Sequence, residues 1–434
     1  MANVIRSIKG TRDFYPSEMV KRQWLIGHMR AASEAFGYQP YDGPCLETLE
    51  LYAAKSGEEL VKEQAFVFED RGGDPVTLRP ELTPTLARMV AEKENELFFP
   101  LRWWSFGPFW RYERPQKGRT REFFQWNIDL IGSESLLADA ELIAVAATFL
   151  RNVGLKPQTV QLLVNDRRLM EKQVRKFGIA SETLPDLLRM IDRLDRQPGH
   201  VWDEKVLGLG LNREQLKGIR ELLGNKELWR ESEELSTVFT ALQELGVGEY
   251  VSYDPKIIRG LDYYTGIVFE AHDTKDEFRA ILGGGRYANL VGDVGGKPLP
   301  GVGFAMGDVV INLVLEKYNL IPQHLENSDG VFVTIFDETT WKSSLELAAE
   351  LRGAGIEATV YPDFDKLAKQ LKYADRMGFT KAVVVGPEEL VKGEVVVKDL
   401  ISREQITLDH AKLIELLKNR FVEKLVVQNQ PNKF

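Results

Sequence analysis

Two β-like runs near residue 115 enclose a short loop rich in positive charge. The runs are LRWWSFGPFW at residues 101–110 and EFFQWNIDLIG at residues 122–132. Apolar and aromatic runs separated by a short polar segment predict an antiparallel hairpin. The segment between them, RYERPQKGRTR, holds five basic residues against one acid, so the hairpin would present a local charge of +4 from its loop and strand ends.

The positive loop is conspicuous because the chain as a whole is acidic. Lys and Arg number 56 against 65 Asp and Glu, which gives a formal net charge of −9. The overall field therefore repels polyanions, and a polyanionic partner has to be met by a local basic patch. Arginines in a hairpin loop suit contacts with polyphosphate or nucleic acid. A solvated basic loop without a ligand is the alternative interpretation.

Length and composition exclude several classes of protein. A chain of 434 residues exceeds what one hydrophobic core usually organises, so two or three domains are expected. Apolar residues at 44% and charged residues at 28% exclude intrinsic disorder as a description of the whole. The single cysteine, Cys45, can form neither an internal disulfide nor a multi-thiolate metal site. Residues 1–10 lack an apolar signal-peptide core, and the apolar run 142–150 is shorter than the ~20 residues of a membrane span, so we expect a cytoplasmic protein without membrane segments.

The pattern of apolar residues divides the chain near residue 327. Before that point helices are predicted at 13–36 and 136–151, and β-like runs separated by turns fill much of the remainder. The stretch 171–245 is charged and helical in pattern, with few strand signals, which indicates an inserted helical module. We therefore expect a first domain at residues 1–326 that contains this insertion.

After the boundary, short apolar strands alternate with helices. VFVTIF, IEATVY and KAVVVG read as buried strands, and helices are predicted at 341–352 and 366–377. This alternation is typical of a small α/β domain with a mostly parallel sheet, here residues 327–434. Basic residues recur along the second helix: Lys366, Lys369, Lys372 and Arg376. A solvated helix face is the default interpretation of that stripe.

Motifs of several enzyme classes are missing from the sequence. It contains no GxxxxGK[ST] phosphate loop, no GxSxG and no HExxH, and GVGFAMG at residues 301–307 misses the GxGxxG spacing. The five histidines are scattered without metal-ligand spacing. Hydrolase and metalloenzyme functions are therefore disfavoured.

The strand after the basic loop alternates between two kinds of side chain. Phe124 begins an apolar series at every second position, whereas Gln125, Asn127 and Asp129 lie between its members. An amide and a carboxylate on one strand face, beside a cationic hairpin, could line a pocket for a small substrate that carries N–H donors. A half-exposed antiparallel strand gives the same alternation, so this pattern alone does not establish a site.

Two glycine-containing segments and one turn are the remaining candidates. IIRGLDYYTGIVFE, residues 257–270, places an arginine before paired tyrosines, although a buried aromatic strand has the same composition. GGGRY, residues 283–287, has glycines that would let a ligand approach the backbone. TLRPELT ends in a predicted helix start with Thr83 as N-cap and Pro84 as its first residue, which favours a purely structural role. The functional alternative makes Glu81 a partner for a substrate ammonium group.

Together these segments resemble histidyl-tRNA synthetase, a family of class II aminoacyl-tRNA synthetases. KGTRDFYP, TLRPELT, RYERPQKGRTREFFQ, RGLDYYTG and GGGRY occur in the family's order, and the likeness covers nearly the whole chain. A looser match around residues 38–47 corresponds to the segment that helps to build the family's homodimer interface. The resemblance implies an α+β fold with an antiparallel catalytic sheet of six or seven strands, a helical insertion at 171–245, and a C-terminal α/β anticodon-binding domain.

The resemblance also implies a two-step reaction. L-Histidine and ATP, which carries Mg²⁺, give histidyl-adenylate and pyrophosphate, and the acyl group then passes to the 3′ end of tRNA(His). Two anions meet in the first step, so positioning and fixed positive charge should supply most of the catalysis. Carried over by position, the catalytic residues are Arg111, at the α-phosphate, and Arg259, between the α-phosphate and the substrate carboxylate.

The remaining site residues follow from the same resemblance. Residues that match the ATP site are Arg111, Glu113, Arg119, Arg121 and Phe123. Residues that match the histidine site are Glu81, Thr83 and Gln125 at the amino group, Asp129 and Tyr264 at the imidazole, and Tyr263 and Tyr287 along the pocket, together with Arg111 and Arg259. The family often has Glu where this chain has Asp129. No side chain is assigned to a metal.

One departure and two alternatives remain. The class II motif 3 arginine is expected early in the helix after GFAMG, where this chain has Val310, so no arginine is assigned to that role. The regulatory subunit of ATP phosphoribosyltransferase is a synthetase-like alternative, but it typically lacks the C-terminal domain and has degraded catalytic segments. Prolyl or threonyl specificity is disfavoured by RGLDYYTG together with GGGRY. The resemblance also makes the basic stripe of the last domain a candidate tRNA contact.

Overall fold

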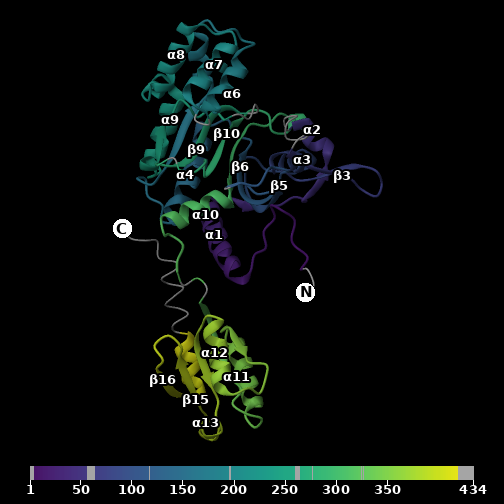
Figure 1. Ribbon diagram of the computed structural model, residues 1–434, viewed down its shortest axis with the longest axis vertical. Helices are drawn as coiled ribbons and strands as arrows, with labels where there is room; N and C mark the ends of the chain where they lie inside the picture. The colour runs from purple at the N-terminus through teal and green to yellow at the C-terminus, as the bar shows by residue number, and fades with distance from the viewer. Residues whose placement is uncertain are drawn as a thin grey trace. The chain divides into compact units, whose positions relative to one another are not determined.

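Two separate units make up the chain in this computed structural model, Met1–Ile321 and Pro322–Phe434 (Figure 1). The residues that the structure describes are 4–55, 64–116, 118–194, 197–259, 264–275, 277–323, 325 and 327–418. None of the helices in these ranges is long and apolar enough to cross a membrane.

A large sheet forms the centre of the first unit. Its strands are β1 (Gln39–Pro40), β5 (Leu101–Trp110), β6 (Glu122–Ile131), β7 (Val160–Asp166), β8 (Val251–Tyr253), β9 (Tyr264–Asp273), β10 (Leu282–Tyr287) and β11 (Gly301–Gly307). Their order is β1-β5-β6-β11-β10-β9-β7-β8. The strands from β5 to β7 in that order pair in antiparallel fashion, whereas the short edge strands β1 and β8 run parallel to β5 and β7. The predicted antiparallel sheet is confirmed for its centre, and the parallel edges extend it.

The predicted hairpin around the basic loop is confirmed. In it Leu101 pairs with Ile131 and Trp110 with Glu122. Alternate residues of β6 face opposite ways, and Trp126 belongs to the main hydrophobic cluster, where the indole Nε1 donates to Ser33 Oγ at 3.1 Å. Helices α1 (Pro16–Ala35) and α4 (Leu136–Asn152) contribute to that cluster and cover this face of the sheet.

A smaller layer covers part of the opposite face. Its elements are β2 (Leu46–Thr48), α2 (Leu49–Lys55), β3 (Phe66–Glu69), β4 (Pro75–Leu78), α3 (Thr83–Lys93) and the short turn η5 (Gly292–Val294). The three strands form an antiparallel sheet in the order β2-β4-β3 among the residues described. Apolar residues of α3, such as Leu86 and Val90, pack with Tyr264, Val268 and Tyr287 of the large sheet.

Helices occupy the chain between β7 and β8. They are α5 (Arg167–Arg175), α6 (Leu184–Asp192), α7 (Gly199–Gly208), α8 (Arg213–Gly224), η3 (Leu228–Glu231), α9 (Glu233–Glu244) and η4 (Gly248–Tyr250). In Figure 1, α6, α7 and α8 gather at the top of the first unit, beyond the strands of the large sheet. Buried side chains such as Leu187, Trp202 and Ile219 continue the main hydrophobic cluster into these helices. The unit ends with α10 (Asp308–Lys317).

The second unit is an α/β fold with a mixed sheet. Its elements are β12 (Ser328–Val333), α11 (Trp341–Gly353), β13 (Ala358–Val360), α12 (Leu367–Arg376), β14 (Phe379–Val384), α13 (Pro387–Lys392), β15 (Glu394–Asp399) and β16 (Gln405–Asp409). β13, β12 and β14 are parallel, but β15 and β16 are antiparallel to their neighbours. The expectation of a mostly parallel sheet is wrong for that half, because the connections on both sides of β15 are shorter than the dozen or so residues that a parallel crossover needs.

Candidate active site

The end of the β5–β6 hairpin holds Arg111 in a defined position. Its backbone N–H donates to the carbonyl of Arg121 at 2.8 Å, and its Nε donates to the carbonyl of Pro80 at 3.0 Å. The guanidinium carbon lies 5.3 Å from the ring centroid of Phe123 on β6. Arg111 is therefore fixed between the TLRPELT turn and β6. A basic loop that is merely solvated would not need its first arginine to be held in this way.

The other predicted ATP-site residues surround the same end of the hairpin. Arg119 Nη1 lies 2.7 Å from Glu113 Oε2, and the Arg119 side chain keeps 43% of its surface exposed. The guanidinium of Arg121 lies 4.3 Å from the ring centroid of Tyr112. Glu113 thus orders part of the loop, while Arg119 stays partly exposed to solvent.

A buried arginine fixes the TLRPELT turn to the hairpin. Arg79 Nη1 donates to Asp42 Oδ1 at 2.7 Å and to Gly43 O at 2.9 Å, and its Nε donates to Pro108 O at 3.0 Å. No local sequence pattern marks Arg79, because its partners Pro108 and Asp42 lie 29 and 37 residues away along the chain. The arginine brings the turn that carries Glu81 and Thr83 beside Arg111.

The helix after this turn begins differently from the prediction. α3 starts at Thr83 with Leu82 in the N-cap position, and no side chain forms a cap hydrogen bond there. Leu82 already has helical backbone angles, φ −98° and ψ −24°, so Thr83 lies inside the helix and lacks the extended backbone from which an N-cap hydroxyl reaches the next turn. The N-cap assignment for Thr83 is wrong. The carbonyl of Glu81 accepts a hydrogen bond from Tyr52 Oη at 3.1 Å.

Asp129 and Tyr287 form a buried polar pair on the site face of the large sheet. Tyr287 Oη donates to Asp129 Oδ1 at 2.8 Å, and Asp129 is 8% exposed. Burial raises the pKa of Asp129 to about 7, and the hydrogen bond from Tyr287 opposes that rise. Burial, with the nearby carboxylate, also raises the pKa of the Tyr287 hydroxyl well above its usual range. The pair therefore places a carboxyl group that titrates near neutral pH inside the fold.

Arg259 and Tyr264 adjoin this pair. Tyr264 lies opposite Tyr287 in the β9–β10 ladder, and the Arg259 guanidinium carbon lies 5.6 Å from the Tyr264 ring centroid. Arg259 Nη1 forms an ion pair with Glu270 Oε1 at 2.8 Å. The remaining predicted residue of this region, Tyr263, lies outside the described residues.

Glycines of β10 and β11 make room for these side chains. A Cβ added to each would overlap one of them: Gly283 with Arg259, Gly285 with Tyr264, Gly301 with Tyr287, and Gly303 with Asp129. The GGGRY glycines alone predict that a ligand approaches the backbone there. The structure fills that space with the site's own side chains, so the glycine pattern reports how closely they approach the sheet.

The two groups of residues share one face of the sheet. Phe123, Gln125 and Asp129 lie at alternate positions of β6 and therefore face the same way. Asn127 on β6 pairs with Ala305 of β11, and Ala305 pairs with Gly283 of β10, so these three residues point to the same face. The Arg259 side chain lies over Gly283 on that face. Since only β11 separates β6 from β10, these strands are about 10 Å apart. The structure thus brings Arg111 and Arg259 to one surface from distant segments, with polar side chains of β6 between them.

α10, the helix in which the motif 3 arginine is expected, begins with a carboxylate, Asp308. Asp308 accepts a hydrogen bond from the backbone of Phe124 at 3.0 Å and pairs with Arg12 Nη2 at 2.8 Å. Val310 packs against the main hydrophobic cluster. Arg12 belongs to the KGTRDFYP segment, in which no local pattern indicates a partner for this arginine.

The described residues include no group of three or more His, Cys, Asp or Glu side chains arranged to hold a metal ion. Mg²⁺ commonly binds proteins through one or two carboxylates, water and substrate phosphates, so it does not require such a group.

Comparisons with known proteins show the family to which the chain belongs. Residues 10–308 match the sequence model of the family described as histidyl-tRNA synthetase, and residues 331–420 match an anticodon binding domain. A histidine–tRNA ligase of Arabidopsis thaliana, chloroplastic/mitochondrial, is 35% identical over 407 residues, which cover 92% of this chain and 83% of the relative. The histidine–tRNA ligase of Haloarcula marismortui is 35% identical over 419 residues, which cover 93% of this chain and 95% of the relative.

A solved structure is similar over the same extent. The crystal structure of histidyl-tRNA synthetase from Nostoc sp. PCC 7120 superposes with a TM-score of 0.85 at 26% identity, covering 96% of this chain and all of the other. The chain therefore belongs to the histidyl-tRNA synthetase family, class II aminoacyl-tRNA synthetases that act as histidine–tRNA ligases.

Proposed function

We propose that the residues on this sheet face activate L-histidine with ATP and then transfer it to tRNA(His). In the first step a carboxylate oxygen of histidine attacks the α-phosphorus of ATP, and the bond from that phosphorus to the bridging oxygen breaks. Pyrophosphate leaves and histidyl-adenylate remains. In the second step a ribose hydroxyl at the 3′ end of the tRNA attacks the acyl carbon, and AMP leaves.

Arg111 and Arg259 are the proposed catalytic residues. Arg111 holds the α-phosphate, and Arg259 bridges the α-phosphate and the histidine carboxylate. The observation that carries the proposal is the position of Arg259 beside the buried Asp129–Tyr287 pair, on the sheet face that Arg111 also reaches. A unit charge at 4 Å in an effective dielectric of about 20 interacts by roughly 4 kcal/mol, so losing one guanidinium could slow the step by about a thousandfold.

The proposed histidine site separates the two ends of the amino acid. Glu81, Thr83 and Gln125 bind the ammonium group, Asp129 and Tyr264 bind the imidazole, and Tyr263 and Tyr287 line the pocket. An ionised Asp129 accepts an N–H bond from the ring. Amino acids without ring nitrogens would leave these polar groups buried and unpaired, which costs several orders of magnitude in kcat/KM.

The proposed ATP site lies at the end of the hairpin. Its residues are Arg111, Glu113, Arg119, Arg121 and Phe123. The aromatic ring suits stacking with a nucleobase, and the arginines suit phosphate oxygens. Mg²⁺ would arrive with ATP, with phosphate and water oxygens as its main ligands. No cation from position 310 contributes, because that residue is Val310.

We propose that residues 1–326 form the catalytic domain, with an insertion at 171–245, and that 327–434 bind the anticodon. The match of residues 331–420 to an anticodon binding domain supports the second assignment. Basic residues at or next to α12 are exposed and suit contacts with tRNA phosphates: Lys366, Lys369, Lys372 and Arg376. A homodimer and a cytoplasmic location complete the proposal.

Histidine-dependent exchange of labelled pyrophosphate into ATP tests the proposed activation step. The purified chain should catalyse this exchange with histidine and not with proline or threonine. Absence of exchange, together with a stable complex with the catalytic chain of ATP phosphoribosyltransferase, would instead identify a regulatory subunit.

Arg259→Ala should keep ATP binding and lose most adenylate formation, and a near-normal single turnover would contradict the role of Arg259.

A further inference from the structure

Arg259 has a backbone conformation that needs support from its surroundings. Its φ angle is +58°, in the left-handed region that non-glycine residues rarely adopt. Such a conformation is strained and persists where neighbouring groups determine it. The residues that hold this arginine therefore bear on where its guanidinium lies.

Glu270 holds the side chain. Its Oε1 lies 2.8 Å from Arg259 Nη1, and both side chains are only 19% exposed, so solvent screens the ion pair less than at the surface. The second carboxylate oxygen of Glu270 lies 2.9 Å from His272 Nε2 on the same strand. Because Gly283 has no Cβ, the guanidinium can lie against β10 beside this carboxylate. A guanidinium carries five N–H donors, so pairing with Glu270 on one side is compatible with binding a substrate oxyanion on another.

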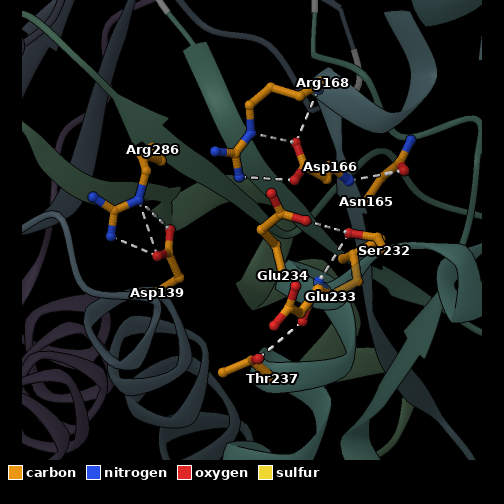
Figure 2. Close-up of polar contacts among 10 residues, drawn as sticks. Asp139, Asn165, Asp166, Arg168, Ser232, Glu233, Glu234, Thr237 and Arg286 are labelled. Carbon is orange, nitrogen blue, oxygen red and sulfur yellow. Dashed lines mark hydrogen bonds and ion pairs between the residues drawn. The ribbon is translucent and has the colours of Figure 1, made fainter. Parts of the chain in front are cut away.

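Asn165 holds the backbone that leads to Arg259. This residue is completely buried near the end of β7. Figure 2 shows it next to Asp166. Its Nδ2 donates to the carbonyls of Pro255, at 3.1 Å, and Ile257, at 3.0 Å, while its Oδ1 accepts from the backbone of Asp166 at 2.8 Å. An aspartate could not donate those two hydrogen bonds, and an alanine would leave two carbonyls without them.

We propose that Asn165 and Glu270 are positioning residues for adenylate formation, acting through Arg259. This inference rests on the proposed role of Arg259 and extends it. Asn165 fixes the end of the segment, Glu270 fixes the guanidinium, and together they hold Arg259 where the α-phosphate and the histidine carboxylate meet. Neither side chain needs to touch the substrate for its loss to slow the reaction.

Substitutions at both positions should change kcat more than KM. Glu270→Gln keeps the size of the side chain and removes its charge, and Asn165→Ala removes both anchoring bonds. We expect kcat for pyrophosphate exchange to fall by about a hundredfold, as for a catalytic group displaced by about 1 Å, with smaller changes in KM for ATP and histidine. Glu270→Asp keeps the charge and should recover part of the rate.

Two matched variants separate positioning from general loss of stability. Glu141→Gln changes a partly buried carboxylate that pairs with Arg102 at 2.7 and 2.9 Å, away from Arg259. Gln173→Ala removes a buried amide that donates to Glu231 at 2.8 Å between helices. Gln173→Ala should lower the unfolding temperature, Glu141→Gln should change it little, and both should leave kcat within about threefold of the original chain, since neither contacts the site.

A double variant gives the decisive comparison. If Glu270 acts through Arg259, adding Glu270→Gln to Arg259→Ala should slow exchange no further. A full additional loss would overturn the proposal. The proposal would also be overturned if Glu270→Gln and Asn165→Ala both had kcat values like those of the controls while Arg259→Ala was severely impaired. That result would leave the role of Arg259 intact. Near-normal adenylation by Arg259→Ala would overturn both assignments.

Discussion

At the scale of single residues, Asp129 shows how burial changes the chemistry of a carboxyl group. Its pKa rises to about 7 because the charged form loses solvation, and the Tyr287 hydrogen bond offsets only part of this effect. The native chain therefore keeps a proton between about pH 4 and pH 7 that the unfolded chain has released. In this window the contribution of Asp129 to the free energy of unfolding falls as the pH rises.

Histidine binding should depend on the same titration of Asp129, but it should become tighter as the pH rises, whereas the contribution of Asp129 to stability falls. An ionised Asp129 accepts an N–H bond from the imidazole, so KM for histidine in pyrophosphate exchange should fall as the pH rises from 6 to 8, by about tenfold for a single group that titrates near 7. Asp129→Asn should raise KM at pH 8 and flatten this dependence. Because the substrate imidazole also titrates near 6.5, the variant serves as the control, and an unchanged pH profile in Asp129→Asn would contradict the assignment.

Residues of the site differ in how far the sequence alone could reveal them. Arg111 could be singled out from the residues themselves, because it begins a basic loop between two strong β-like runs, whereas its role and the choice of Phe123 come only from the family resemblance. Arg79 and Glu270 could not be singled out, since their roles depend on partners that only the folded chain brings near, and an arginine or glutamate looks the same in a local pattern whether paired or solvated.

At the scale of elements, a buried ion pair joins β10 to α4. Arg286 Nε donates to Asp139 Oδ1 at 3.0 Å, and its two Nη atoms donate to the carbonyls of Ser133 and Ser135 at 2.8 Å each. Figure 2 shows the guanidinium facing the Asp139 carboxylate. Arg286 precedes Tyr287 on the strand, so this clamp holds the strand end on the side opposite the site.

Breaking the clamp should destabilise the first unit strongly. Arg286→Gln leaves the Asp139 carboxylate buried without its ionic partner, and we expect the free energy of unfolding to fall by about 3–5 kcal/mol, measured by urea denaturation. Arg102→Gln is a control, because the Arg102–Glu141 pair is 35% and 22% exposed and should contribute about 0–1 kcal/mol. Equal losses in the two variants would contradict this account.

Elements were predictable where one local signal determined them. The hairpin strands match their predicted runs closely, because each run is long, apolar and bounded by polar residues. The sheet of the second unit was predicted less well. Apolar runs alone do not give strand direction. The alternation of strands and helices suggested parallel strands, but the short connections before and after β15 make it pair antiparallel with β14 and β16.

At the scale of the whole molecule, each hydrophobic cluster among the described residues lies within one unit. The main cluster and the one beneath α3 belong to the first unit, and those around Val383 and Phe332 belong to the second. A chain shortened to residues 1–321 should therefore fold without the rest. It should also keep histidine-dependent pyrophosphate exchange within about threefold of the full chain, because every proposed activation residue lies in it.

The same shortened chain should charge tRNA(His) poorly. Removing one of two linked binding units lowers affinity by about a hundredfold or more, so kcat/KM for tRNA should fall by that factor while exchange persists. Unfolding temperature and exchange rate, measured on the same preparation, would show that the fragment is intact. Loss of exchange in a folded fragment would mean that the second unit contributes to activation, and unchanged tRNA charging would contradict its proposed role with the anticodon.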